Sequence, residues 1–155
     1  MDRRTVGLDW YFQMVIDWGF TESLLAKGDL VKARLSAHHF LQRTLTTSER
    51  TYRALAYEVN ARVAMAGQDL GRAQELIAKA VQEMEGYEVP LAHWRVHATA
   101  AELYRRRGNR DLAERHRELS RATIMKLANS LPAEEPLRTT FLSAPMIRKI
   151  LGDKS

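Results

Sequence analysis

The fold is decided by one stretch in the middle of the chain. Residues 46–86 read TTSERTYRALAYEVNARVAMAGQDLGRAQELIAKAVQEMEG. Thr46 and Glu49 have the spacing of a capping box, and a helical run without glycine or proline follows as far as Gly67. A second helical run, rich in alanine and leucine, then ends at Gly86. The stretch therefore predicts one helical hairpin.

The punctuation of this hairpin recurs along the chain. Each copy has an aspartate followed by a leucine, with a glycine just upstream. The three copies are Gly28 with Asp29-Leu30, Gly67 with Asp69-Leu70 and, less cleanly, Gly108 with Asp111-Leu112. A period of about forty residues is typical of a helical repeat array. We therefore expect an all-α protein with antiparallel hairpins at about 8–43, 49–86 and 91–131.

The residues after the third hairpin are expected to close the array. Two short apolar segments follow Pro132 and are divided at Pro145. Short helices of this kind cover the exposed face of a last repeat. Residues 132–151 are therefore predicted to form a C-terminal cap, and residues 1–155 a single domain.

Composition excludes several classes of protein. The chain has 155 residues, a formal net charge of +5 and no cysteine, so a disulfide framework, a thiolate metal site and a cysteine nucleophile are ruled out. No apolar run has the length of a membrane span, and the first residues lack the apolar segment of a signal peptide. We expect a cytoplasmic protein that is not an enzyme and needs no cofactor.

The first helix, predicted over about 8–27, is unusually aromatic. Five of the twelve aromatic residues lie in it, and apolar side chains surround most of its circumference. A terminal helix that faces water should show one apolar stripe. One interpretation is packing within the array. The preferred one is a contact with a second copy of the chain or with an adjacent domain, carried by Trp10, Tyr11 and Phe12.

The central hairpin offers a candidate binding surface. Arg53, Tyr57 and Asn60 share one flank of its first helix, and together they provide charge, apolar area and an amide. We assign them, with Arg95 of the third hairpin, to a concave face that binds a protein or peptide. The alternative is that Tyr57 belongs to the core and its neighbours are solvated. On the second helix of the hairpin, the polar residues expected to face outward are Glu75, Lys79, Gln82 and Glu83.

Two further patterns in the third hairpin suggest chemistry. His93 and His97 lie four residues apart, as in a helical zinc site, but the glutamate of an HExxH motif is absent and no third ligand is evident. Metal binding is therefore not expected. Seven arginines crowd the following region with acidic residues between them. They are Arg105, Arg106, Arg107, Arg110, Arg115, Arg117 and Arg121. A solvated, ion-paired surface is preferred there, and binding of nucleic acid or another anionic ligand is the alternative.

The chain also resembles known helical repeats. With glycines at the turns, Ala33 and Ala73 a few residues later, and Ala101 and Tyr104 before the third turn, the hairpins look like degenerate tetratricopeptide repeats. Each repeat is about six residues longer than the usual length, and the third is out of register by two. The resemblance implies hairpins stacked as a right-handed superhelix, an α-α solenoid.

A second resemblance is more specific. Four segments are similar to the extreme C-terminal repeat region of large bacterial signal-transduction ATPases, in which cyclase, kinase or DNA-binding heads precede an ATPase. The segments are residues 9–11, 55–58, 90–101 and 136–145. No glycine loop for nucleotide phosphates exists in the chain. The resemblance implies an interaction or regulatory scaffold in signalling, with a protein or peptide as partner. From the lack of a long apolar run, no membrane contact is expected.

Overall fold

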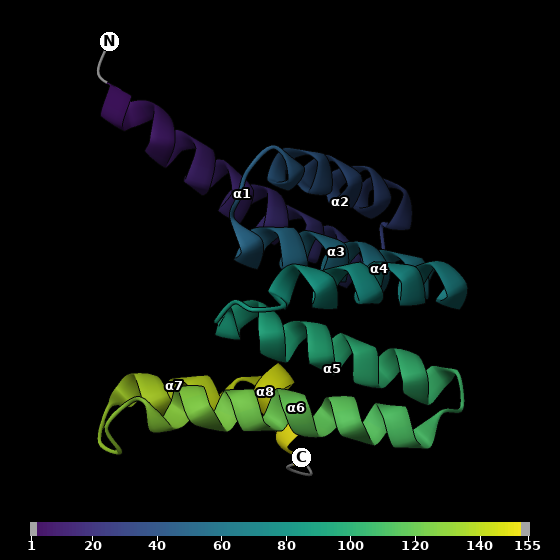
Figure 1. Ribbon diagram of the computed structural model, residues 1–155, viewed down its shortest axis with the longest axis vertical. Coiled ribbons are helices and arrows are strands. Elements are labelled where there is room, and N and C mark those ends of the chain that lie inside the picture. The colour runs from purple at the N-terminus through teal and green to yellow at the C-terminus, as the bar shows by residue number, and fades with distance from the viewer. Residues whose placement is uncertain (1–2, 153–155) are drawn as a thin grey trace. The chain divides into compact units, whose positions relative to one another are not determined.

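The structure is a computed structural model that describes the backbone of residues 3–152 and the side chains from Asp9 onward. All of the regular structure in this part of the chain is α-helical (Figure 1). The helices are α1 (Arg3–Ala26), α2 (Leu30–Leu45), α3 (Arg50–Ala66), α4 (Leu70–Met84), α5 (Pro90–Arg106), α6 (Arg110–Asn129), α7 (Pro136–Ser143) and α8 (Pro145–Leu151). The expected all-α class and the division at Pro145 are confirmed. No helix in the described range is long and apolar enough to cross a membrane.

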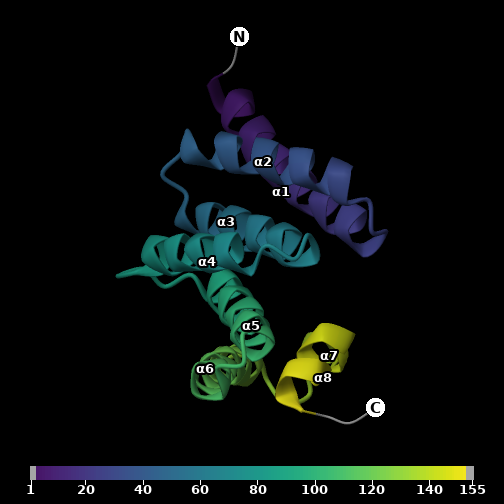
Figure 2. The same ribbon diagram turned by 90° about the vertical axis from the view of Figure 1, so that its right-hand side faces the viewer.

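The helices form two compact units, which divide between Tyr87 and Glu88. In the first unit, α1 packs against α2 and α3, α2 packs against α3, and α3 packs against α4. In the second unit, α5 packs against α6, and α6 packs against both α7 and α8. Figure 2 gives a second view of these helix pairs. The expectation of a single domain over 1–155 stays a prediction.

The three turns within the hairpins share one backbone geometry, a Schellman motif. Gly28, Gln68 and Gly108 each adopt a left-handed conformation, with φ of 74°, 64° and 75°. In each turn, the amide of the residue after the left-handed position donates to the carbonyl five residues upstream. The donor and acceptor pairs are Asp29 to Leu24, Asp69 to Ala64 and Asn109 to Tyr104. The spacing between corresponding residues is therefore constant, and the third turn is not shifted.

The residue that follows each left-handed position caps the next helix. The side chains of Asp29, Asp69 and Asn109 accept hydrogen bonds from the amides of Lys32, Arg72 and Leu112. The match of Asp111-Leu112 to the earlier Asp-Leu pairs was therefore wrong, because Asn109 takes the capping role in the third turn. Asparagine and aspartate both offer an oxygen acceptor at this position.

The capping box expected for α3 is also wrong. Thr46 ends α2, where its hydroxyl donates to the carbonyl of Arg43. Glu49 is itself the N-cap of α3, and its carboxylate accepts from the amides of Thr51 and Tyr52. A glutamate reaches these amides because its side chain can fold back over the first turn, so α3 begins one residue later than predicted.

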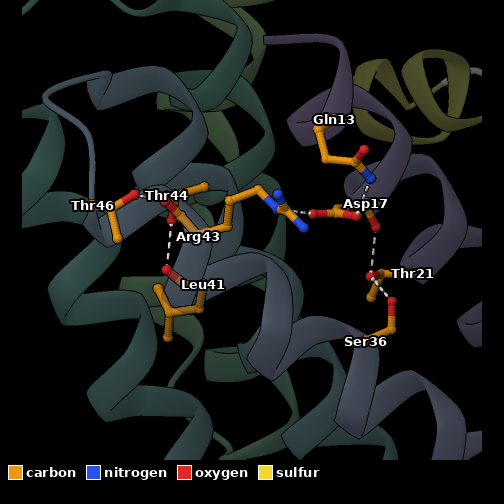
Figure 3. A network of polar contacts seen from close by, with 8 residues as sticks. All are labelled: Gln13, Asp17, Thr21, Ser36, Leu41, Arg43, Thr44 and Thr46. Atoms are coloured by element: carbon orange, nitrogen blue, oxygen red, sulfur yellow. Dashed lines mark hydrogen bonds and ion pairs between the residues drawn. The ribbon is translucent and has the colours of Figure 1, made fainter. Parts of the chain in front are cut away.

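Polar contacts fix α1 against α2 (Figure 3), and an ion pair joins α1 to α3. Asp17 accepts from Arg43 Nε of α2 at 2.6 Å, and the hydroxyls of Thr21 and Ser36 lie 2.7 Å apart. Glu22 of α1 pairs with Arg62 of α3. The charged side chains of the middle of α1 therefore point toward its neighbours.

The second unit has its own apolar core. Trp94 of α5, Ile124 of α6 and Ile147 of α8 are buried together. Side chains from α6 to α8 complete the cluster, namely Leu127, Phe141, Leu142, Ala144, Ile150 and Leu151. The hydroxyl of Ser120 is buried and donates to the carbonyl of Trp94 at 2.8 Å. The short helices α7 and α8 thus cover apolar side chains of the α5–α6 hairpin.

Candidate interaction site

A cluster of basic and aromatic side chains lines the seam between α3 and α4. Its members are Arg50, Arg53, Tyr57, Lys79, Glu83 and Tyr87, and we call it the seam cluster. On α3, the spacing of three and four residues places the first three members on one face. Lys79 and Glu83 lie four residues apart on the facing helix α4. The antiparallel packing of the hairpin brings these two faces together.

Glu83 is the centre of the seam cluster. One carboxylate oxygen of Glu83 lies 2.7 Å from Arg53 Nη2, and the other lies 2.5 Å from Arg50 Nη1. The hydrogen bond that Arg50 donates to Glu83 raises the pKa of Arg50. Glu83 is 8% exposed, so the prediction that it faces outward was wrong. Burial of a carboxylate is tolerated here because two guanidinium groups satisfy both of its oxygens.

The aromatic members of the cluster lie over cations. The guanidinium carbon of Arg50 is 4.9 Å from the ring centroid of Tyr87, which is exposed. Lys79 Nζ is 5.9 Å from the ring centroid of Tyr57, which is half-buried. Arg53 Nε has no hydrogen-bond acceptor among the described residues. The cluster thus holds three cations and one carboxylate, and it retains an unused donor.

Asn60 has a different role from its expected neighbours. Its amide nitrogen donates at 2.8 Å to the carbonyl of Ala37 and at 2.8 Å to the carbonyl of Ala56. The first bond joins α3 to α2, and the second lies within α3. The amide that was expected to satisfy the backbone of a partner is therefore bound to the chain's own backbone.

Arg95 lies in the second unit, on α5. Its guanidinium carbon is 4.8 Å from the centroid of the buried Trp94 ring, and its side chain is half-buried. The structure therefore brings Arg53 and Tyr57 into one cluster, directs Asn60 toward α2, and places Arg95 on a separate unit. The binding role proposed for these four residues stays a prediction.

Three histidines gather between α5 and α6. The ring centroids of His93 and His97 are 4.4 Å apart, and His97 Nδ1 lies 2.8 Å from Nδ1 of His116. His116 stacks on Tyr104, and the hydroxyl of Thr123 is 2.7 Å from His93 Nδ1. His116 was not among the residues singled out from the sequence, because its contact with His97 depends on how α6 packs against α5. In the described part of the chain, no group of such side chains is arranged to hold a metal ion.

Burial controls the protonation of these histidines. It lowers the pKa of His97 to about 3, and the neighbouring His93 and His116 add to the effect. Burial also lowers the pKa of His93, and burial together with Arg115 lowers that of His116. The cluster is therefore held in its neutral form at pH 7, in which one nitrogen of each ring donates a hydrogen bond and the other accepts one.

The arginine-rich region of the third hairpin is partly neutralised. Glu102 accepts from Arg105 at 2.8 Å and from Arg106 at 2.7 Å. These hydrogen bonds lower the pKa of Glu102 to about 2, and the bond from Arg105 has the largest effect. Arg117 lies 3.8 Å from Glu114 on α6. The surface is mixed in charge, which agrees with the ion-paired interpretation for these residues.

The three aromatic residues predicted for self-association have unequal environments. Trp10 is half-buried. Tyr11 packs edge-on against Tyr52 of α3, with 5.5 Å between ring centroids and 3.3 Å between hydroxyl oxygens. Phe12 is 57% exposed. Only Phe12 of the three presents most of its side chain to solvent.

Of the features that sequence reasoning missed, the outward face of α1 could have been found and the pairing of Glu83 could not. Ile16 and Phe20 continue the spacing of Phe12 by fours, so the outward face of α1 was visible in the pattern. The partnership of Glu83 with two arginines was not visible, because it depends on how α4 packs against α3.

We compared the chain with known protein families, with characterised proteins and with solved structures, and none of them matches it.

Proposed function

We propose that the chain is a protein-binding module that takes an acidic peptide segment along the seam between α3 and α4. The observation that carries this proposal is the seam cluster, in which one buried carboxylate is shared by Arg50 and Arg53. Lys79 adds a third positive charge beside them. One carboxylate balances only one of the three cations, so the cluster attracts further carboxylates.

The geometry of the cluster suits a peptide better than a small anion. Guanidinium groups bind carboxylates through two parallel hydrogen bonds, and tyrosine rings beside them supply apolar contact area. Tyr57 and Tyr87 flank the arginines in this way. Arginine and tyrosine are also the residue types that contribute most to binding energy at protein interfaces. Arg53 and Tyr57 keep their proposed binding role, and Arg50, Lys79 and Tyr87 join them.

The fold-level part of the proposal is that the hairpins are tetratricopeptide-like. Three identical turns, each with a left-handed residue followed by an N-cap, support a common repeat of forty residues. The stacking of three hairpins as a right-handed superhelix belongs to the same proposal. Repeat arrays of this type present helix faces to protein ligands. A role as a scaffold in bacterial signal transduction follows from the sequence resemblance alone.

A binding assay with two charge-neutralising variants tests this function. The probe is a short fluorescent peptide of alternating glutamate and alanine, with a lysine-alanine peptide of equal length as control. We expect the wild-type chain to bind only the acidic peptide and Arg53→Gln to weaken binding about tenfold, the loss of one charge-assisted contact. Arg34→Gln makes the same charge change on α2, near Gly67 at the other end of α3, and should bind as wild type.

The results that contradict the proposal are equally specific. Binding that is absent, or that Arg53→Gln and Arg34→Gln weaken equally, would show that general positive charge attracts the peptide. Circular dichroism on both variants checks that the helices persist. A gel shift with nucleic acid at low salt tests the alternative through the exposed Arg110, Arg115 and Arg121 of α6. A steep loss of affinity with salt would favour that alternative.

A further inference from the structure

The outer face of α1 carries no charge over ten consecutive residues. Every exposed position between residues 11 and 20 is apolar or glycine. These positions are Tyr11, Phe12, Val15, Ile16, Gly19 and Phe20, and we call them the α1 apolar face. A helix on the surface of a soluble protein normally places polar residues outward and apolar residues inward. On α1 the outward side is apolar.

The polar residues of α1 are used on its inner side. Asp17 pairs with Arg43 of α2, and Glu22 pairs with Arg62 of α3. Met14 is fully buried on the same inner side. These contacts fix the rotation of α1 about its own axis, so the helix cannot turn its apolar face inward without breaking two ion pairs. The first turns of α1 extend beyond α2 (Figures 1 and 2), and the side chains of the α1 apolar face are exposed.

The exposed area matches a protein interface. Phe12, Ile16 and Phe20 are 57%, 60% and 59% exposed, and Tyr11 and Val15 add smaller areas. Together they expose on the order of 500 Å², if a full aromatic side chain is taken as about 200 Å². This is near the upper end for the largest patch on a monomer, and more than half of the ~800 Å² that each partner contributes to a standard interface.

The order of the most exposed side chains on the face suits a second copy of the chain. Phe12, Ile16 and Phe20 are spaced by four residues, so the pattern reads the same in both directions about Ile16. In an antiparallel helix pair with a two-fold axis at Ile16, each Phe12 lies opposite Phe20 of the other copy. A two-fold interface pairs the same patch of both copies, and an apolar face without charge is complementary to itself. Gly19 has no atom within 4 Å of the place a Cβ would take, so the backbone there is open to close approach.

We propose that two copies of the chain dimerise through the α1 apolar face, with their α1 helices antiparallel and crossing at Ile16. The absence of charge on the face argues against the acidic peptide expected at the seam cluster. A membrane surface is disfavoured as well, because membrane-binding helices keep basic residues on their polar side, and Asp17 and Glu22 occupy that side here. The dimer is independent of the seam cluster.

Sedimentation of the full chain over a range of concentrations tests the dimer. We expect a reversible dimer for wild type and at least a tenfold weaker one for Ile16→Glu, because a carboxylate pair would be buried at the two-fold axis. Leu137→Glu is the matched control, since Leu137 is 59% exposed on α7 of the other unit. It should leave the dimer unchanged. A wild-type chain that stays monomeric at its solubility limit, or that binds lipid vesicles as a monomer, would overturn the proposal.

The chain has no cysteine, so single thiols can report the geometry of the pair. Ile16→Cys should form a disulfide-linked dimer under mild oxidation, because a two-fold axis at residue 16 brings the two sulfur atoms together. Phe12→Cys and Phe20→Cys should crosslink with each other when mixed, and neither should crosslink alone. Phe12→Cys that crosslinks with itself as readily as Ile16→Cys would overturn the antiparallel arrangement.

Discussion

At the scale of single residues, the left-handed position in each turn is the feature that defines the repeat. Gly28 and Gly108 fill it at two turns, and Gln68 fills it at the third, with φ of 64°. A side chain with a Cβ is strained in this conformation, by roughly 1 kcal/mol. The hydrogen bonds of the turn and the Asp69 cap hold Gln68 there.

Gln68→Gly should therefore stabilise the chain. We expect the free energy of unfolding to rise by roughly 0.5–1 kcal/mol, because glycine relieves the strain and offsets its own entropy cost. Gly28→Ala is the mirror-image control, and it should lower stability by a similar amount. Urea unfolding of both variants measures the changes. Equal destabilisation by the two substitutions would contradict the assignment of Gln68 to the glycine position.

Asn60 gives a second prediction at this scale. Asn60→Ala removes the amide donor that reaches the carbonyl of Ala37 on α2. The free energy of unfolding should fall by roughly 1–2 kcal/mol, since the hydrogen bond that joins α3 to α2 at the carbonyl of Ala37 is lost. Arg34→Ala on the exposed face of α2 is the comparison and should have little effect. Equal stability of Asn60→Ala and wild type would show that water replaces the amide without cost.

At the scale of helices, the histidine cluster ties α5 to α6. His97 and His116 meet across the two helices through their Nδ1 atoms, and Thr123 of α6 contacts His93. The contact between Nδ1 atoms requires that one of the two rings be neutral, so that it can accept. The packing of the helix pair is thereby linked to proton binding.

Stability should depend on pH between 6.5 and 3. The pKa of His97 is about 3 in the folded chain, against an ordinary value of 6.5, so the unfolded chain binds the proton first. Stability is therefore fully present above pH 6.5 and is lost as the pH falls toward 3. Between pH 7 and pH 5 the loss should be roughly 2 kcal/mol for this one histidine.

Urea unfolding at pH 7 and pH 5 measures this slope. His97→Gln should make the slope shallower, even where it lowers stability at pH 7. His38→Gln makes the same substitution at an exposed position on α2 and serves as the control variant. An NMR titration that showed His97 protonated at pH 6 would contradict the buried, neutral state.

The sequence predicted those helices that local signals define. Gly28, Asp29 and Asp69 mark turn and cap positions by residue type alone, and the helix bounds beside them agree to within two residues. The capping box at Thr46 failed because the same spacing can end one helix instead of starting the next. The predicted shift of the third hairpin was wrong because Asn109, and not an aspartate, is the N-cap residue in that turn.

Side-chain partners could not be predicted in the same way. The burial of Glu83 and the inward direction of Asn60 depend on which helix packs against which, and a single sequence does not specify this. His97 and His116 lie 19 residues apart and meet only across the α5–α6 pair. The outward face of α1 was predictable in part. The spacing of its apolar residues is evident in the sequence, but which side of the helix faces outward depends on the ion pairs of Asp17 and Glu22.

At the scale of the whole molecule, the contacts divide the chain at Tyr87. Each unit has its own buried side chains, among them Phe40 and Leu55 in the first and Trp94 and Ile124 in the second. Fragments 1–87 and 88–155 should therefore each remain helical by circular dichroism, and their spectra should add up to that of the full chain. A fragment that is unfolded alone would show that its helices depend on the other unit.

We propose that the whole molecule acts by binding acidic peptide at the seam cluster of its first unit. An NMR titration of the full-length, isotopically labelled chain with the glutamate-alanine peptide tests it most directly. We expect saturable shifts in the resonances of Arg53, Tyr57 and Lys79 and no shift in those of the α6 arginines. Shifts confined to residues 105–121, or no saturable shift in any resonance, would contradict it.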